Sequence, residues 1–461
     1  MPDSHERLTS SGAPPTVGFQ NLVAASPSAF AACFRCDLEN RSGPNQPVPT
    51  AGRSVDLFEK CYRFEELHQV QATGLYPYFR AIAASDATEV TIQGKRLVMV
   101  GSNNYLGLTN HPEVIEAAVH AARKYGSGCT GSRFLNGTLE LHEELERRLA
   151  QFLRRPACLA FSTGFQACLG VLSAIAGKDD LIFCDRDNHA SIIDGTRLSF
   201  AKTIKYHHND MADLEEKLSL APEDKGKLIV ADGVFSMLGD IVKLPKMSEL
   251  AKRFGARVLL DDAHAFGVLG AHGRGTAEHF GLERETDLVM GTFSKSLASI
   301  GGFAAGEFDV IQWLKHKSRS LIFSASLPPA STAGVIAALD IIEREPQRRT
   351  ALWRNAEKMR RGLQSLGFDT GLSETPVVPV VLGDREFTFR FWRALFDRGV
   401  FTNPVCSPAV PAGCDLLRTS YMATHTDAQL DFVLEQFAAV LREMGPTPRS
   451  RSGGAAIAAT R

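Results

Sequence analysis

Short strand-like runs separated by helical patterns dominate the middle of this 461-residue chain. Most of these runs are apolar throughout, and the spaces between them are filled by helical periodicity. The runs cover residues 158–162, 181–184, 202–207, 228–231, 258–261 and 287–290. Strands that are apolar on both faces are typical of parallel sheets covered by crossover helices. The pattern therefore predicts an α/β fold with a mostly parallel sheet.

The pattern changes on both sides of this region. Before it, we expect a helix over 56–73 and short strands at 89–92 and 96–100. After Pro328, long amphipathic helices alternate with a few short strands, which indicates a second, smaller domain. The predicted layout is a flexible extension at 1–52, an N-terminal helix with small strands at 53–110, a large cofactor-binding domain at 111–325, a small α+β domain at 326–445 and a disordered tail at 446–461.

Polar side chains follow several of the predicted strands. Ligands of such folds collect beyond the carboxyl ends of parallel strands, so these side chains are candidates for a site. Gly164 and Phe165 open a helix whose free N–H groups suit a phosphate. His189 begins another helix and could stack on an aromatic ring, although a lone histidine is more often structural. Ser236 follows the strand at 228–231 and could donate to a ring oxygen.

Asp261 ends the strand at 258–261. A carboxylate at the end of a buried strand is costly unless a cation pairs with it, and a protonated pyridine nitrogen is such a cation. His264, three residues later, could reach the neighbouring phenolic oxygen of the same ring. The alternative is that Asp261 and Asp262 cap a helix or bind a metal.

Lys295 lies just past the strand at 287–290, with Thr292 and Ser294 close before it. A loop lysine is usually only solvated. These hydroxyls, however, and the glycine pair that follows at 301–302, fit a phosphate held beside an amine that can form a Schiff base. A phosphate cup, a stacking histidine, a pyridine-pairing aspartate and a Schiff-base lysine together indicate a pyridoxal 5′-phosphate (PLP) enzyme.

Five motifs carry a resemblance to a known family. They are Ser-Asn-Asn-Tyr-Leu-Gly-Leu at 102–108, Gly-Ser-Arg followed by Asn-Gly-Thr within 131–138, Asn-His-Ala-Ser at 188–191, Asp-Asp-Ala-His at 261–264 and Thr-Phe-Ser-Lys-Ser at 292–296. Over about 60–445 the chain resembles the α-oxoamine synthases, a branch of the aspartate aminotransferase-like, fold-type I PLP enzymes. The resemblance implies a seven-stranded, mostly parallel sheet covered by helices, with a smaller C-terminal α+β domain. Family members condense an amino acid with an acyl thioester.

The resemblance also implies a role for each candidate residue. Lys295 would be the Schiff-base lysine and the acid/base at Cα, with Asp261 on the pyridine nitrogen, His189 stacked on the ring, and His264 and Ser236 on the phenolic oxygen. Gly164, Phe165, Thr292 and Ser294 would hold the phosphate. Ala325 belongs to a segment that would reach the phosphate of a second subunit, which implies a homodimer with shared sites. Asn104 and Arg418 would hold the amino acid carboxylate, a task that the planar arginine fork suits.

Within this family, the segment around Lys295 most resembles that of the serine palmitoyltransferases. This implies condensation of L-serine with a long-chain acyl thioester to 3-ketosphinganine, the first step of sphingolipid synthesis. One position departs from a bacterial pattern of that group, because Cys406 stands where an arginine opens a loop. A 7-keto-8-aminopelargonate synthase, or a relative that uses alanine or glycine, therefore remains an alternative. Two further alternatives are a plain aminotransferase and a catalytically silent subunit, although Lys295 argues against the latter.

Composition excludes several other classes of function. A net charge of −1 gives no electrostatic case for nucleic acid as a partner. No apolar run is long enough to span a bilayer, and no secretory signal is evident. The nine cysteines are scattered, and the single pair Cys33–Cys36 is weak evidence for zinc, so no metal is expected. We expect a cytoplasmic enzyme, with peripheral contact at the inner membrane a further expectation. The acyl carrier, coenzyme A or acyl carrier protein, is left open.

Overall fold

The computed structural model describes residues 56–446, apart from the side chain of Glu66. The chain divides after Leu67 into two units. The described part of the first unit holds helix α2 (Glu59–Tyr62) and the start of α3 (Glu65–Ala72). The sequence predicts one helix over 56–73, whereas the structure has these two separate helices. The helix α2 buries no residue, and a short helix without a packed face is marginal in water. The predicted extension at 1–52, the Cys33–Cys36 pair and the tail from 447 lie outside the described residues.

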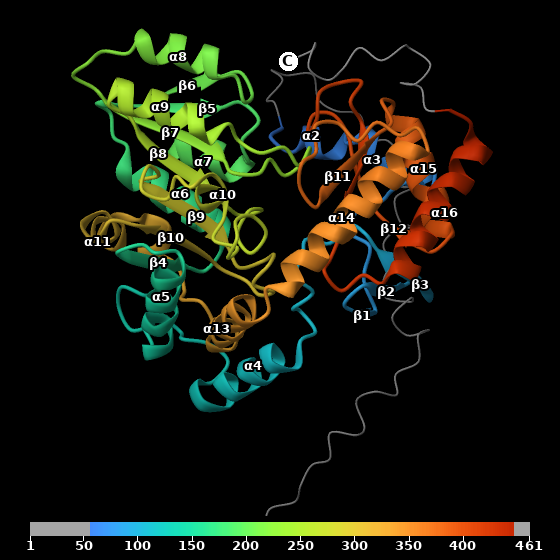
Figure 1. Ribbon diagram of the computed structural model, residues 1–461, viewed down its shortest axis with the longest axis horizontal. Coiled ribbons are helices and arrows are strands. Elements are labelled where there is room, and N and C mark those ends of the chain that lie inside the picture. The colour runs from blue at the N-terminus through green and yellow to red at the C-terminus, as the bar shows by residue number, and fades with distance from the viewer. Residues whose placement is uncertain (1–55, 447–461) are drawn as a thin grey trace, which may run out of the picture. The chain divides into compact units, whose positions relative to one another are not determined.

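The second unit contains a seven-stranded sheet in the order β4-β10-β9-β8-β7-β5-β6 (Figure 1). Its strands are β4 (Ala157–Phe161), β5 (Asp180–Asp185), β6 (Lys202–Tyr206), β7 (Gly226–Asp232), β8 (Arg257–Asp261), β9 (Leu288–Thr292) and β10 (Gly302–Gly306). Only β10 runs opposite to the others, antiparallel to both β4 and β9. The predicted mostly parallel, seven-stranded sheet is confirmed.

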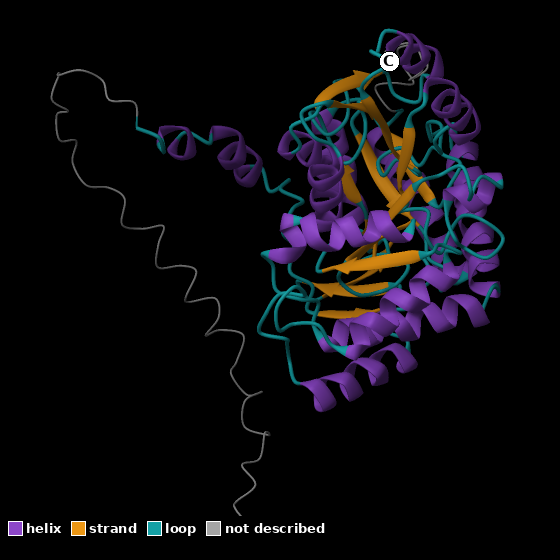
Figure 2. Ribbon diagram, turned by 90° about the vertical axis from the view of Figure 1, so that its left-hand side faces the viewer, coloured by secondary structure: helices purple, strands orange, loops and turns teal. Residues whose placement is uncertain are grey.

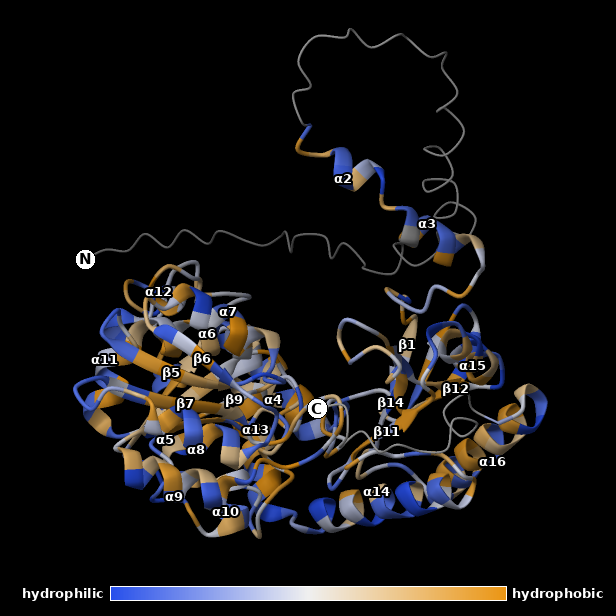
Figure 3. Cartoon of the chain, turned by 90° about the horizontal axis from the view of Figure 1, so that it is seen from above, coloured by the Kyte–Doolittle hydropathy of each residue, from blue (hydrophilic) through white to orange (hydrophobic). Residues whose placement is uncertain are grey.

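Both faces of this sheet are buried, as the apolar strands predict. In β7, Leu228 and Val230 join a core cluster with α6 (Gly164–Ile175) and α7 (Ala190–Leu198). The alternate residues Ile229 and Ala231 join a second cluster, with α8 (Met211–Ser219) and α9 (Leu244–Phe254). Helices therefore lie on either side of the strands (Figure 2). The strands are mostly hydrophobic, whereas α8 also contains hydrophilic residues (Figure 3).

Further helices complete the large sheet's surroundings. They are α4 (Pro112–Tyr125), α5 (Glu140–Phe152), α10 (Thr276–Phe280), α11 (Phe308–Lys317), α12 (Arg319–Ile322) and α13 (Pro329–Arg344). The helix α13 packs against α4 and α5, and all three contribute to the core beneath β4, β9 and β10.

The C-terminal part begins with α14 (Gln347–Ser365), which runs away from the large sheet (Figure 1). It continues through β11 (Val377–Val381), α15 (Arg385–Asp397), β12 (Val400–Phe401), β13 (Asn403–Val405), β14 (Leu416–Ser420) and α16 (Asp427–Met444). The strands β11, β14 and β13 form an antiparallel sheet. Its core combines aliphatic and aromatic side chains and includes the buried Trp392 and Tyr421.

Three early strands join this C-terminal part. They are β1 (Ala84–Asp86), β2 (Glu89–Ile92) and β3 (Lys95–Met99), and β3 pairs in parallel with β12. Residues predicted as part of a separate segment at 53–110 thus share a sheet with residues 400–401. The domain boundaries given above stay a prediction. Within 56–446, no helix combines the length and apolar character needed to cross a membrane.

Candidate active site

A cavity of about 320 Å³ lies where β4, β5, β7, β8 and β9 end. These parallel strands share one direction, so the loops that follow them meet at the same edge of the sheet. Eight of the twelve residues predicted for the site line this cavity: Gly164, Phe165, His189, Asp261, His264, Thr292, Ser294 and Lys295. The other four, Asn104, Ser236, Ala325 and Arg418, lie outside its lining.

Lys295 is carried by a loop that closes on itself after β9. The Phe293 amide donates to the Gly301 carbonyl at 2.9 Å, and the Ser299 amide donates back to the Phe293 carbonyl at 2.9 Å. Gly301 has φ +125°, and a Cβ on it would lie 2.4 Å from the Phe293 ring, so only glycine fits. Burial lowers the pKa of Lys295 to about 8; the charge of Asp261 opposes this effect and that of Arg418 adds to it.

Two carboxyl groups lie in this cavity rather than one. Asp261 ends β8, and its strand neighbour in register is Asp232, the last residue of β7. The Asp261 Oδ1 accepts from the Ala263 amide at 3.0 Å, and its Oδ2 is 3.4 Å from the Cys168 thiol. Burial, and then the charge of Asp261, raise the pKa of Asp232 well above its usual value. Sequence reasoning did not single out Asp232, although it ends a strand just as Asp261 does.

His189 is held firmly at the start of α7. Its amide donates to Asp232 Oδ2 at 3.1 Å, and its ring Nδ1 lies 2.7 Å from the Ser191 hydroxyl. Burial lowers the pKa of His189; Asp261 opposes this effect, and the charge of Lys295 adds to it. The ring is therefore kept neutral, which suits stacking on another aromatic ring.

His264 sits on the same side of the cavity and is tied to Tyr105. Its Nδ1 lies 2.7 Å from the Tyr105 hydroxyl, and both side chains are buried. Burial lowers the pKa of His264 well below its usual value, and the nearby cations Lys295 and Arg418 add to this shift. The imidazole Nε2 is the atom left for a ligand.

The opposite end of the cavity is built from the start of α6. The Thr163 hydroxyl caps this helix by accepting from the Gln166 amide at 3.0 Å. A Cβ on Gly164 would lie 2.9 Å from Thr292, so the helix start and the end of β9 approach as closely as they can. The Thr292 and Ser294 hydroxyls are 2.9 Å apart. Free helix N–H groups beside two hydroxyls form an anion-binding arrangement.

Ala325 lies over the same helix start, outside the cavity lining. Its carbonyl accepts from the Ser162 hydroxyl, and the neighbouring Ser324 hydroxyl accepts from the Gln166 side chain at 2.7 Å. The segment therefore touches the phosphate-binding helix of its own chain. Large apolar side chains near it are exposed, among them Phe165 and Phe323.

Arg418 is buried, 5% exposed, in the middle of β14. Its Nε donates to the Ser236 carbonyl at 2.6 Å, and its Nη2 donates to Asn103 Oδ1 at 2.9 Å. Among the described residues, no carboxylate lies within ion-pair distance of this guanidinium. A buried cation without an anion is costly, so this geometry calls for an anionic ligand.

Two of the predicted ligands are engaged in other contacts. The Asn104 side chain donates to the Thr109 hydroxyl at 2.8 Å and accepts from the Leu108 amide at 3.0 Å, so it braces its own loop. Its neighbour Asn103, which sequence reasoning passed over, contacts Arg418 instead. Ser236 lines a second cavity beside the first one. It reaches Arg418 through its backbone carbonyl rather than through its hydroxyl.

Cys406 occupies the position of the loop arginine as an inert group. The side chain is buried, and burial, followed by the charge of Asp415, raises the pKa of its thiol to about 12. A neutral thiol does not pair with a carboxylate as an arginine does.

The cavity fits PLP on the chemistry of its donors. It presents an anion-binding helix start at one end, a buried carboxylate at the other, a neutral histidine ring held rigidly, and an amine with a lowered pKa. These groups match the phosphate, the pyridine nitrogen, the ring face and the aldehyde of PLP, respectively. The buried Oδ1 of Asp232, which also lines the cavity, has no hydrogen-bond partner, and none of these four PLP groups is matched to it.

Comparisons with known proteins agree with this site. The family described as aminotransferase class I and II matches residues 95–437. A serine palmitoyltransferase of Sphingobacterium spiritivorum is 52% identical over 387 residues, covering 84% of this chain and 97% of that protein. An 8-amino-7-oxononanoate synthase of Thermoanaerobacter pseudethanolicus is 43% identical, covering 82% and 96%.

A solved structure shows the same similarity. It is a serine palmitoyltransferase variant from S. paucimobilis with a bound PLP–myriocin aldimine, with a TM-score of 0.83 and 39% identity, covering 85% of this chain and 99% of that one. Both the fold and the relatives lead to one conclusion. The chain belongs to the α-oxoamine synthase branch of the class I and II aminotransferase family, which uses PLP.

Proposed function

We propose that this chain catalyses the PLP-dependent, decarboxylating condensation of L-serine with a long-chain acyl thioester, giving 3-ketosphinganine. The observation that carries the proposal is the buried guanidinium of Arg418, which has no acidic partner among the described residues. Its charge lowers the pKa values of Lys295 and His264, which line the cavity, so the guanidinium lies near that site. An amino acid carboxylate bound there would bring the amino group and Cα toward the amine of Lys295.

The residues named above would hold the cofactor. Thr292, Ser294 and the start of α6 would hold its phosphate, Asp261 its ring nitrogen and His264 its phenolic oxygen, with His189 against the ring face. When bound, PLP supplies a reactive aldehyde and an electron-withdrawing ring that stabilises negative charge at the amino acid Cα. Asp261 supports this by keeping a proton on the ring nitrogen.

The chain itself provides the proton transfer. With its lowered pKa, the Lys295 amine is ready to take a proton from Cα and to return it after carbon dioxide is lost. Arg418 and Asn103 would fix the carboxylate, which holds Cα in place while the thioester carbonyl approaches. His189, held from two sides, would keep the substrate against the ring face.

Serine is the amino acid that the relatives favour. Similarity to serine palmitoyltransferases reaches 52% identity, against 43% for the 8-amino-7-oxononanoate synthases. The uncharged Cys406 leaves Arg418 as the one arginine of the proposed carboxylate site. It removes no group that would select the serine hydroxyl.

We infer further that the enzyme is a homodimer with shared active sites. Exposed apolar side chains gather around the cavity and the Ser324–Ala325 segment, and such patches mark interfaces. A long-chain product dissolves in membranes, so we expect a cytoplasmic enzyme that meets the inner membrane peripherally.

The test is an absorbance spectrum of the purified protein, titrated separately with L-serine, L-alanine and glycine. We expect a visible PLP band that responds to L-serine at the lowest concentration. A response to alanine or glycine alone would keep the family and overturn the substrate. A protein that shows no band after addition of PLP would overturn the proposal itself.

A further inference from the structure

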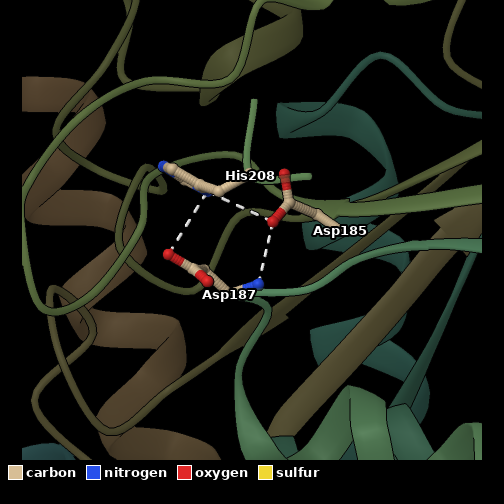
Figure 4. A group of neighbouring side chains, drawn as sticks. All are labelled: Asp185, Asp187 and His208. Carbon is tan, nitrogen blue, oxygen red and sulfur yellow. Dashed lines mark hydrogen bonds and ion pairs between the residues drawn. The ribbon is translucent and has the colours of Figure 1, made fainter. Parts of the chain in front are cut away.

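The buried His208 lines the second cavity and contacts two aspartates that lie far from it in the sequence. The Nδ1 of His208 lies 3.1 Å from Asp185 Oδ1, and its Nε2 lies 2.8 Å from Asp240 Oδ2. All three side chains are buried, and the ring also packs edge-on against Phe235 with ring centres 4.3 Å apart. Figure 4 shows that the same nitrogen, Nδ1, also faces Asp187, whose carboxylate is 3.8 Å away. None of these groups has a part in the chemistry proposed above.

The arrangement fits an imidazolium rather than a metal ligand. Asp185, Asp187 and His208 are of types that can bind a metal, and their oxygen and nitrogen atoms lie close together. Metal binding, however, needs a free nitrogen lone pair, and here both ring nitrogens face carboxylates at hydrogen-bonding distance. A ring that donates from both nitrogens is positively charged, and two carboxylates neutralise it.

The contact between His208 and Asp185 constrains the loop that carries His189. Asp185 ends β5, and its Oδ1 also accepts from the Asp187 amide at 2.9 Å, which sets the first turn of the loop. The next residue, Asn188, donates to the Val230 carbonyl and accepts from the Asp232 amide, both at 2.9 Å. The loop is thus fixed at its beginning by His208 and at its end by β7.

The contact between His208 and Asp240 is linked to Arg418 through the turn that holds Ser236. Asp240 closes a tight turn, because the Phe235 amide donates to the Asp240 carbonyl at 3.0 Å and the Gly239 amide to the Phe235 carbonyl at 2.8 Å. Ser236 lies within this turn, and its carbonyl accepts from Arg418 Nε at 2.6 Å. A shift of Asp240 therefore shifts the carbonyl that orients the guanidinium.

We propose that His208 is a positioning residue, which joins the His189 loop to the Ser236 turn and so sets the place of the cofactor ring relative to the carboxylate-binding Arg418. The inference rests on the proposed function, since it names the amino acid as the ligand of Arg418. Distances between such groups matter because a small misplacement of a substrate costs a large part of the rate.

The charge state of His208 gives a separate signature. Burial lowers the pKa of His208, but the hydrogen bonds that the ring donates to Asp185 and Asp240, together with the charges of these carboxylates, outweigh burial and raise it to about 9. The other titratable groups near His208 are Asp187 and Arg186, which line the second cavity with it, and the buried Tyr206 and Cys184. Because the folded-state pKa lies above the ordinary value of 6.5, the stabilisation is complete below pH 6.5 and is lost as the pH rises through about 9.

The experiment compares His208→Gln with His207→Gln in the PLP-loaded enzyme. His207 is a matched control, because it directly precedes His208 and its Nδ1 also lies 2.8 Å from an aspartate, at Asp213 Oδ2. Unlike His208, its side chain is exposed. The serine dissociation constant, read from the spectral change, is expected to rise at least tenfold in His208→Gln and to change less than twofold in His207→Gln. The KM for serine is expected to rise more than kcat falls, and the melting temperature of His208→Gln to differ most from wild type below pH 6.5.

A second variant covers the case in which His208→Gln does not fold. Asp240→Asn keeps the shape and removes one charge, and it should raise the same dissociation constant in the same direction. An unchanged serine affinity in either folded variant overturns the inference. If wild-type enzyme does not respond to serine, the proposed function fails, and the affinity for PLP decides instead: equal PLP affinity in the His208→Gln and His207→Gln proteins overturns the positioning role.

Discussion

The amine of Lys295 combines burial with a nearby negative charge, and the balance decides its protonation. Burial is the larger effect and lowers its pKa to about 8, while Asp261 opposes the shift and Arg418 adds to it. A neutral amine is the form that attacks an aldehyde. The residue is thereby ready for Schiff-base formation near neutral pH, which an exposed lysine would not be.

The first prediction concerns the uptake of PLP by the cofactor-free protein. Its rate constant should rise with pH up to about 8 and level off above, because deprotonation of Lys295 generates the reactive amine. Stopped-flow absorbance between pH 6 and 10 measures it. A midpoint near the ordinary lysine value would contradict the assignment. Lys295→Ala should show no band of a lysine Schiff base, whereas Lys317→Ala, which changes an exposed lysine of α11, should keep it.

A second prediction at this scale concerns Arg418. Arg418→Lys keeps the charge but loses the fork that contacts Ser236 and Asn103 together. We expect the KM for serine to rise by roughly 30- to 100-fold, equivalent to about 2–3 kcal/mol for charge-assisted hydrogen bonds, with PLP affinity unchanged. Steady-state kinetics and a PLP titration check this. Arg393→Lys, on the outer side of α15, is the control that should behave as wild type.

At the scale of elements, the site consists of loops that follow parallel strands. The loop after β9 is the most constrained of these, because Gly301 packs under the Phe293 ring at a φ of +125°. Its backbone hydrogen bonds fix the direction in which Lys295 leaves the strand. Stability of the loop and function of the lysine are therefore coupled.

Gly301→Ala should separate this packing from simple backbone strain. The added Cβ would meet Phe293 at 2.4 Å, whereas at Gly255, with φ +63°, it would meet nothing within 4 Å. Strain alone is worth about 1 kcal/mol, so Gly255→Ala should lose about that much unfolding free energy. Gly301→Ala should lose about 3 kcal/mol or more and bind PLP more weakly. Urea unfolding and PLP titration measure both, and equal losses in the two variants would refute the packing argument.

The elements show why much of this site could be predicted from the sequence. Asp261 and Lys295 each end or follow a strand whose apolar pattern is unmistakable, and strand ends meet at one edge. The strand β10 was missed because most side chains of Gly302–Gly306 are small and the strand begins and ends with glycine. Sequence patterns give the elements reliably when periodicity is strong.

The features that sequence patterns did not reveal have a physical cause in common. Asn103 and Asn104 are adjacent and identical in type, and only the turn geometry decides that one faces Arg418 and the other braces the loop. His208 contacts Asp185 and Asp240, which lie 23 and 32 residues away from it, and no local pattern marks such contacts. Directions of side chains in loops depend on tertiary structure, which the sequence pattern does not contain.

At the scale of the whole molecule, the open question is how the exposed apolar surface near the site is covered. Leu135 is 79% exposed and Phe323 is 74% exposed, and both lie next to segments that are tied together, since the Ser326 amide donates to the Gly131 carbonyl at 2.9 Å. Exposed side chains of this size, grouped beside a cavity, are typical of an interface. A second copy of the chain is the partner we expect, with Ala325 reaching toward its phosphate site.

The final prediction follows from this surface. Wild-type protein should sediment as a dimer, and Phe323→Glu combined with Leu135→Glu should shift it toward monomer, because two charges cannot be buried there without partners. If the active sites are shared, the monomeric variant should also bind PLP at least tenfold more weakly. Leu220→Glu is the control, since Leu220 is 76% exposed at the end of α8, away from the cavity. Analytical ultracentrifugation with PLP absorbance measures both quantities together. A monomeric variant that binds PLP as tightly as wild type would show that each subunit holds a complete cofactor site of its own.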